Sequence, residues 1–328
     1  MKLRLLAVFI ISTLLISCNH QSNEHRLDNT NVLSIPQNST EEILNESNDS
    51  CLSPTNKQTN DDNSSFGINV FGDEGPIGYL LADGKDEHQL KVFLDYQSSN
   101  ADSANASLRL YLLEDGKPIN FSIDEKEWSE KNDIKIPYNE GTFVNLKFKT
   151  SDNFGCINLI CMDGENQATN LTTVYPMFNK NSSVSYSEKY KKYMVKMEQN
   201  GVWGLGITDN KVDPKSEYQV SPYVSKTFSV SGNTPQLYLE LFSGNNSENR
   251  TFYILLFCDG ELLQAFEGEY SMFVDCEGSS LALEYPINNN LKNGVHKYQV
   301  MAVQNQMSSD VVEDHVNWIT NKFTIDKK

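Results

Sequence analysis

The sequence predicts an all-β protein that consists of two tandem antiparallel β-sandwiches. From Phe66 onward, short runs alternate apolar and polar residues, as strands do when one face of a sheet is buried. Asp-Gly, Glu-Gly and Asn-Gly dipeptides separate these runs, and Asp-Gly in particular favours a hairpin turn. The elements occur twice in the same order. Strands at this spacing with polar turns favour sandwiches over a parallel sheet.

Residues 1–17 have the composition of a secretory signal peptide. Lys2 and Arg4 make a basic start, an apolar run follows from Leu5 to Ile16, and Ser17 is a small residue at the end. The apolar run is shorter than the about 20 residues that a membrane-spanning helix needs. We therefore expect cleavage between Ser17 and the next residue.

Cys18 follows that small residue directly. The stretch Leu15-Ile16-Ser17-Cys18 resembles the lipobox of bacterial lipoproteins, with Ile16 as a departure and Ser17 as a tolerated variant. The resemblance implies that the Cys18 thiol receives a diacylglycerol. The protein would then be lipid-anchored in the cell membrane and face its extracytoplasmic side. An ordinary signal peptide with an incidental cysteine, or an uncleaved anchor, is the alternative.

Residues 19–65, which follow Cys18, are rich in Asn, Ser, Thr, Asp, Glu and Gln. Such a segment buries too little apolar surface to offset the entropy of ordering, so we expect 18–65 to be a lipidated cysteine with a disordered tether. Its root-mean-square span would be about 40 Å.

The repeat sets the boundaries of the sandwiches at about 66–180 and 181–328. Leu108–Gly116 recurs as Phe252–Gly260, and Glu140–Phe148 recurs as Glu277–Tyr285. We expect half-buried strands at Leu90–Leu94, Leu108–Leu112, Val144–Phe148, Tyr238–Leu241, Phe252–Phe257, Leu281–Tyr285 and Tyr298–Val303. This pattern resembles bacterial immunoglobulin-like or fibronectin-type modules, without a family-specific motif. The resemblance implies immunoglobulin-like sandwiches and no function.

Between the copies, Tyr and Met recur at helical spacing within residues 186–199, with Lys residues around them. We expect a linker helix there that packs between the domains. The alternatives are a basic amphipathic segment that docks on lipid or a partner, and a first strand of the second domain, because Tyr193, Val195 and Met197 alternate.

Charge excludes some partners. The formal net charge is −17, and it falls to −19 when Lys2 and Arg4 leave with the signal peptide. An acidic surface repels phosphate backbones, so nucleic acid is not an expected partner. The same charge argues against binding of the protein surface to anionic lipid. We therefore expect contact with membrane lipid only through the acylated Cys18.

Five further cysteines are present: Cys51, Cys156, Cys161, Cys258 and Cys276. Their spacing matches no zinc motif. Cys258 and Cys276 are both present in the second copy and both absent from the first, so we expect a disulfide between them, with free thiols as the alternative. Cys156 and Cys161 are too far apart on one strand to be joined.

No catalytic motif is found. The histidines of the folded region, His88, His296 and His315, have no recognisable nucleophile beside them in sequence. The acidic stretch Asp310–His315 is expected to be an exposed loop rather than a metal site, and Asp209–Glu217 lacks the glycine of an EF-hand. We expect no enzyme, no metal and no cofactor.

Two aromatic residues, Trp128 and Tyr270, lie in similar contexts in the two copies, Glu127-Trp128-Ser129 and Glu269-Tyr270-Ser271. They are candidate ligand-binding residues, as stacking platforms for sugar or anchors for a protein. The alternative is that each plugs the end of its sandwich.

Together these features predict a non-enzymatic, membrane-anchored module for binding or adhesion to a surface protein or glycan. An extracytoplasmic enzyme or accessory domain that acts on cell wall or peptides is a second hypothesis. A structural or assembly scaffold at the cell surface is a third.

Overall fold

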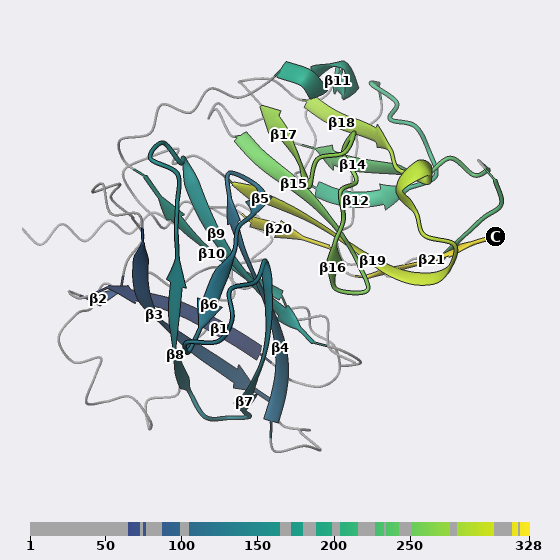
Figure 1. Ribbon diagram of the computed structural model, residues 1–328. Coiled ribbons are helices and arrows are strands. Elements are labelled where there is room, and N and C mark those ends of the chain that lie inside the picture. Colours follow the sequence, from purple (N-terminus) through teal and green to yellow (C-terminus); the bar gives the residue numbers. More distant parts are fainter. Residues whose placement is uncertain are drawn as a thin grey trace, which may run out of the picture.

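In the computed structural model (Figure 1), nearly all regular secondary structure of the described residues is β-strand. The structure describes residues 65–72, 75–76, 87–98, 105–164, 172–179, 188–198, 204–215, 227–232, 234–242, 251–275, 281–304, 317–320 and 322–328. Within these ranges the only helices are the 3-10 turns η1 (Glu188–Tyr193) and η2 (Asn288–Asn290). The prediction of an all-β fold is confirmed.

The first sandwich is formed by sheets A and B, and every strand pair in it is antiparallel. Sheet A has the order β2 (Gly75–Pro76), β1 (Ser65–Gly72), β3 (His88–Gln97), β8 (Thr142–Phe148) and β6 (Phe121–Ile123). Sheet B has the order β10 (Thr172–Phe178), β9 (Cys156–Asp163), β4 (Asn105–Glu114) and β5 (Lys117–Pro118), with β7 (Lys131–Pro137) also paired to β4.

The second sandwich is formed by sheets C and D. Sheet C has the order β11 (Met194–Lys196), β18 (Leu281–Pro286), β14 (Tyr238–Phe242) and β12 (Gly204–Thr208). Sheet D has the order β13 (Thr227–Val230), β21 (Phe323–Lys327), β19 (Gly294–Gln304), β15 (Thr251–Cys258) and β16 (Glu261–Leu262), with β17 (Ser271–Asp275) paired to β15 and β20 (Asn317–Ile319) to β19. The pairing of β13 with β21 is parallel.

The sequence repeat corresponds to a repeat of topology. The order β1-β3-β8 in sheet A recurs as β12-β14-β18 in sheet C, and β4 and β15 occupy matching places in sheets B and D. Both hairpins turn at an Asp-Gly pair, with φ of 48° and 78° at Asp115-Gly116 and of 52° and 77° at Asp259-Gly260. Positive φ at both central residues is the geometry that Asp-Gly favours.

Each sandwich has its own core, and a third apolar cluster joins them. Inward residues of sheets A and B form one core, and those of sheets C and D form another. The opposite faces of sheets B and D meet through Tyr111, Leu113, Ile160, Phe257 and Met301, among others. The molecule therefore stacks its sheets in the order A, B, D, C.

This stacking corrects one expectation about the strands. We expected Leu108–Leu112 and Phe252–Phe257 to be half-buried, but β15 is buried at every residue and β4 nearly so. The reason is that β4 and β15 are covered on both faces, by the core of their own sandwich and by the facing sheet, whereas β7 at the side of sheet B keeps the exposed face of an ordinary antiparallel strand.

Polar contacts surround the apolar interface between the sandwiches. Arg109, which is 5% exposed, donates Nε and Nη2 to Asp133 at 2.7 and 3.0 Å and Nη1 to Glu261 of the second sandwich at 2.7 Å. Lys131 donates to the same Glu261 at 2.7 Å. The Tyr111 hydroxyl donates to the carbonyl oxygen of Gly260 at 2.9 Å.

The predicted linker helix is largely wrong. Within the described part of residues 186–199, η1 is a single 3-10 segment, and the chain then continues as the strand β11 on the edge of sheet C. The strand alternative was correct for Met194–Lys196 because these residues pair with β18. No described helix is long and apolar enough to cross a membrane.

Candidate functional site

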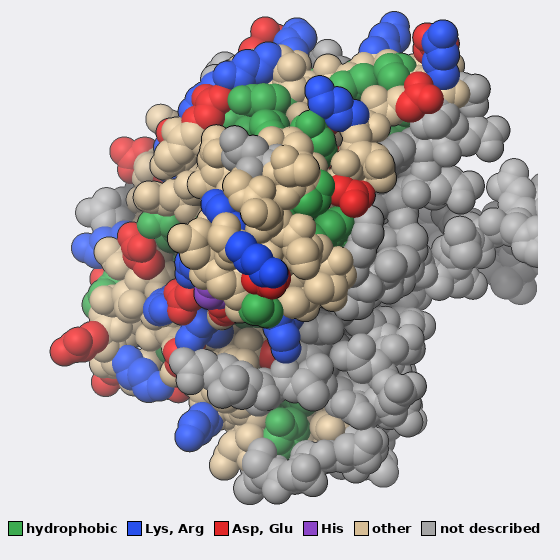
Figure 2. All heavy atoms as spheres, turned by 90° about the vertical axis from the view of Figure 1, so that its right-hand side faces the viewer, with side chains coloured by type: hydrophobic (Ala, Val, Ile, Leu, Met, Phe, Trp, Pro, Cys, Tyr) green, Lys and Arg blue, Asp and Glu red, His purple; other side chains and the backbone are tan. Residues whose placement is uncertain are grey.

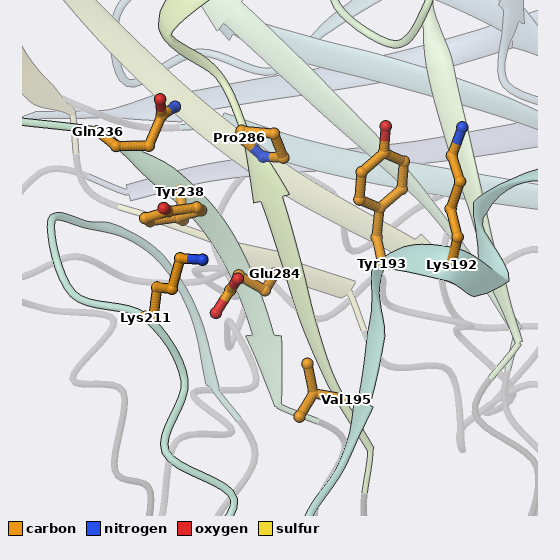
Figure 3. A pocket seen from close by; sticks show the side chains of 8 residues that line it. All are labelled: Lys192, Tyr193, Val195, Lys211, Gln236, Tyr238, Glu284 and Pro286. Carbon is orange, nitrogen blue, oxygen red and sulfur yellow. The ribbon is translucent and has the colours of Figure 1, made fainter. Parts of the chain in front are cut away.

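A groove of about 330 Å³ lies on the outer face of sheet C, the face turned away from the core (Figure 3). It is lined by Lys192, Tyr193, Val195, Lys211, Gln236, Tyr238, Glu284 and Pro286. Basic and hydrophobic side chains gather over this part of the second sandwich, where η1 and β11 lie at the top of Figures 1 and 2.

The pairing of β11, β18 and β14 places these side chains. Tyr238 pairs with Pro286 and Glu240 pairs with Glu284 across β14 and β18. Because side chains alternate along a strand, all four lie on the outer face, while Leu239 and others point into the core. In Figure 3, Glu284 and Pro286 lie between Tyr193 on one side and Tyr238 on the other.

Glu284, which lines the groove, has a second carboxyl residue, Glu240, as its neighbour on the paired strand. Glu240 is 3% exposed, and its carboxyl group makes no hydrogen bond or ion pair with any residue that the structure describes. Burial, together with the neighbouring Glu284 carboxylate, raises the pKa of Glu240 to about 8. Glu284 accepts a hydrogen bond from the backbone N–H of Val212 at 2.8 Å, which holds the loop after β12 against the sheet.

Tyrosine rings and lysines form the walls. The Tyr193 ring packs edge-on against Tyr285, and its hydroxyl donates to Glu267 at 3.1 Å. Lys192 donates to the same carboxylate at 2.8 Å, and these two donors lower the pKa of Glu267. Lys211 is exposed and places its ammonium 6.0 Å from the centre of the Tyr238 ring. The groove thus offers aromatic surface beside polar groups that can donate and accept hydrogen bonds.

The two aromatic residues predicted to bind ligand lie elsewhere. Trp128, in the segment between β6 and β7, is 44% exposed, so it does not plug its sandwich. Tyr270 immediately precedes β17 and is half-buried. In the repeat, Tyr111 of β4 corresponds to Leu255 of β15, and their strand partners are Lys131 and Ser271. Tyr270, one residue before Ser271, therefore corresponds to Glu130. Trp128 lies two residues earlier, so the two aromatic residues are not equivalent in position.

The cysteine predictions are only partly covered. Cys156 and Cys161 are buried free cysteines on β9, as expected of small apolar strand residues, and Cys258 is also a buried free cysteine. A free Cys258 contradicts the predicted disulfide with Cys276, which itself lies outside the described residues. The preceding residue, Asp275, pairs with Thr251, about 23 Å along β15 from Cys258.

The remaining residues that the sequence singled out do not line the groove. Ser17, Cys18 and the stretch Asp310–His315 lie outside the described residues, as does Glu217. His88 contacts the hydroxyl of Thr150 at 3.1 Å and stacks on Phe148.

Sequence reasoning missed the carboxyl pair. Glu240 and Glu284 occupy polar positions of alternating strands, where a solvated side chain is the ordinary expectation. Only the strand register brings them together, with Glu240 buried and Glu284 half-buried under the loop that contains Val212. Tyr193 was noticed, but as part of a helical stripe.

No protein-family model and no curated protein sequence matches the chain. Among solved structures, a bacterial adhesin from Mobiluncus mulieris with intramolecular disulfide, isopeptide and ester cross-links is 10% identical, covers 80% of this chain and 98% of its own, and has a TM-score of 0.22. The C-terminal domain of the Streptococcus agalactiae AgI/II polypeptide BspA is 10% identical over 79% of this chain and 99% of its own, at 0.20. CBD12 from CALX1.2 is 8% identical over 71% of this chain and 79% of its own, also at 0.20.

Proposed function

We propose that this chain is a non-enzymatic binding module for glycans on the extracytoplasmic side of a bacterial membrane. The groove on sheet C carries the proposal. Its volume of about 330 Å³ lies within the range of small-ligand sites, roughly 300–1,000 Å³. A tyrosine edge beside ammonium, amide and carboxylate groups supplies the mixture of apolar contact and hydrogen bonding that a sugar ring needs.

The lipobox-like sequence at Cys18 supports the location. Acylation there would attach the module to the membrane, and the polar tether would hold the sandwiches away from the lipid. The acidic net charge agrees with a lipid anchor rather than with adsorption on anionic lipid.

The test is calorimetric titration of the soluble protein with purified cell-wall and surface polysaccharides. Tyr193→Ala and Lys211→Ala should each weaken binding about tenfold or more, and Lys211 is exposed, so its variant should melt like the wild type.

Trp128→Ala and Tyr270→Ala are the matched controls, because both remove an aromatic ring outside the groove. They should bind as the wild type does. If they weaken binding while Tyr193→Ala and Lys211→Ala do not, the ligand binds at the sandwich loops and the groove is misassigned.

A further inference from the structure

A second cluster lies at the other end of the second sandwich, where the β15–β16 hairpin turns. Cys258 is the last residue of β15, Asp259 is in the turn, and His296 is on β19 beside it. Asp259 Oδ2 lies 2.6 Å from His296 Nδ1 and 3.7 Å from Cys258 Sγ. The candidate ligand atoms of the three side chains all lie within 4.8 Å of one another.

The His296 ring lies between a carboxylate and a backbone carbonyl. Its Nε2 lies 2.9 Å from the carbonyl oxygen of Asn293, which can only accept a hydrogen bond, so Nε2 carries the proton. In a neutral ring, Nδ1 would then direct its lone pair at the oxygen of Asp259. The 2.6 Å contact is therefore a hydrogen bond that holds a second proton. A zinc ion would replace that proton, and Nδ1 and Oδ2 would move apart to about 3.3 Å as two ligands of one tetrahedral ion. A ring N–H held by a backbone carbonyl is also the usual support of a metal-binding histidine.

The first sandwich shows that a turn of this kind needs neither the cysteine nor the histidine. Asp115 has the corresponding place and accepts from the backbone N–H groups of Gly155 and Cys156 at 2.9–3.0 Å. Glu114 pairs with Ile157 in the first copy, and Cys258 pairs with Tyr298 in the second. Glu114 therefore corresponds to Cys258. Two residues before each partner, Gly155 corresponds to His296. The second copy therefore adds two potential metal ligands to the same turn.

We propose that Cys258, Asp259 and His296 bind a zinc ion, with water as the fourth ligand. Thiolate, imidazole and carboxylate are the ligands that zinc takes in proteins. The Cys258 side chain closes the site on the core side. The side chains of Asp259 and His296 are 47% and 25% exposed, which leaves a path from solvent and room for water.

Titration of the metal-free purified protein with Co²⁺ and Zn²⁺ tests the proposal. One Co²⁺ per chain should bind with a thiolate-to-cobalt charge-transfer absorption, and Zn²⁺ should displace it. Cys258→Ser should abolish that absorption, and His296→Asn should weaken Zn²⁺ binding at least tenfold. His88→Gln removes the other described imidazole and should leave binding unchanged.

Three results would overturn the proposal. One is the absence of Zn²⁺ binding at micromolar concentration, which would mean that His296 holds only a second proton. Another is equal binding by wild type and by both variants, each with a wild-type melt. The third is a Cys258 thiol that resists alkylation until the protein is reduced, since that thiol would be in a disulfide.

Discussion

Two glycines with nearly the same backbone geometry have different surroundings. Gly116 and Gly260 follow the aspartates of matching hairpin turns, with φ of 78° and 77°. A Cβ on Gly116 would overlap Ser271 and Tyr253 of the second sandwich, whereas the nearest atom to a Cβ on Gly260 is Arg109 Nη1 at 3.6 Å. The two positions therefore separate backbone strain from packing between the sandwiches.

Replacement of each glycine by alanine should show that separation. Both variants carry the cost of a left-handed backbone, about 1–2 kcal/mol. Gly116→Ala should destabilise the protein by at least about 1 kcal/mol more than Gly260→Ala, because Ser271 and Tyr253 must move. Chemical denaturation measures both. Equal losses of unfolding free energy in the two variants would mean that the contact of Gly116 with Ser271 and Tyr253 can be broken without loss of stability.

Glu240 should make stability depend on pH in the direction opposite to most carboxylates. Its pKa is raised from 4.5 to about 8, so between these values the folded protein keeps a proton that the unfolded chain releases. This contribution is fully present below about pH 4.5 and is lost as pH rises through about 8, at up to about 1.4 kcal/mol per pH unit.

Glu240→Gln should remove that dependence. The variant should gain stability relative to the wild type between pH 5 and pH 8, measured as the difference in unfolding free energy at several pH values. Glu284→Gln is the companion variant, and it should flatten the dependence as well because it removes the neighbouring charge. If the unfolding free energy of the wild type instead rises from pH 5 to pH 8, the raised pKa of Glu240 beside Glu284 is contradicted.

Cys18→Ala tests the anchor. Without the thiol there is no site for the diacylglycerol, so the protein should appear in the medium or persist as the uncleaved precursor. Fractionation and intact mass measure this. Membrane association equal to that of the wild type, with no acyl mass on the native protein, would mean that the anchor is misidentified.

At the scale of elements, β4 joins the two sandwiches. One of its faces contributes to the core of the first sandwich, and the other packs on sheet D through Tyr111 and Leu113. Arg109 is the polar residue at this contact, and Asp133 and the surrounding acidic groups raise its pKa further. Its partners remain partly exposed, with side chains 52% exposed for Asp133 and 39% for Glu261.

Arg109→Met and Lys131→Met should therefore differ, although both remove a cation from Glu261. Loss of Arg109 should cost about 1–3 kcal/mol, because a buried guanidinium with three hydrogen bonds is removed. Loss of Lys131, whose side chain is 42% exposed, should cost less than about 1 kcal/mol. If the two variants lower the melting temperature by similar amounts, the burial of Arg109 does not make its ion pair stronger than the exposed one of Lys131.

At the scale of the whole molecule, each sandwich has its own apolar core, but each also has an apolar outer face that only the other sandwich covers. The separate fragments 66–180 and 181–328 should each give β-type circular dichroism and a cooperative melt. Each should melt below the intact protein, because separation exposes the apolar faces of sheets B and D. Two outcomes would contradict this expectation: a dominant helix signal in either half, or melting of the halves at the temperature of the intact protein.

The sequence by itself determined the fold class, the seven expected strands, the Asp-Gly hairpins and the order of the repeat. These are local properties, since alternation along Leu90–Leu94 or the turn at Asp259-Gly260 is written in neighbouring residues. Tertiary structure alone decided which strands are buried on both faces, because that depends on sheet B meeting sheet D. It also decided which polar side chains meet. Glu240 meets Glu284 only through the pairing of β14 with β18, and Cys258 meets His296 only through the pairing of β15 with β19. Residues more than thirty positions apart become neighbours through strand pairing, whereas alternation along one strand shows only which face of a sheet a residue takes and not which strand lies opposite.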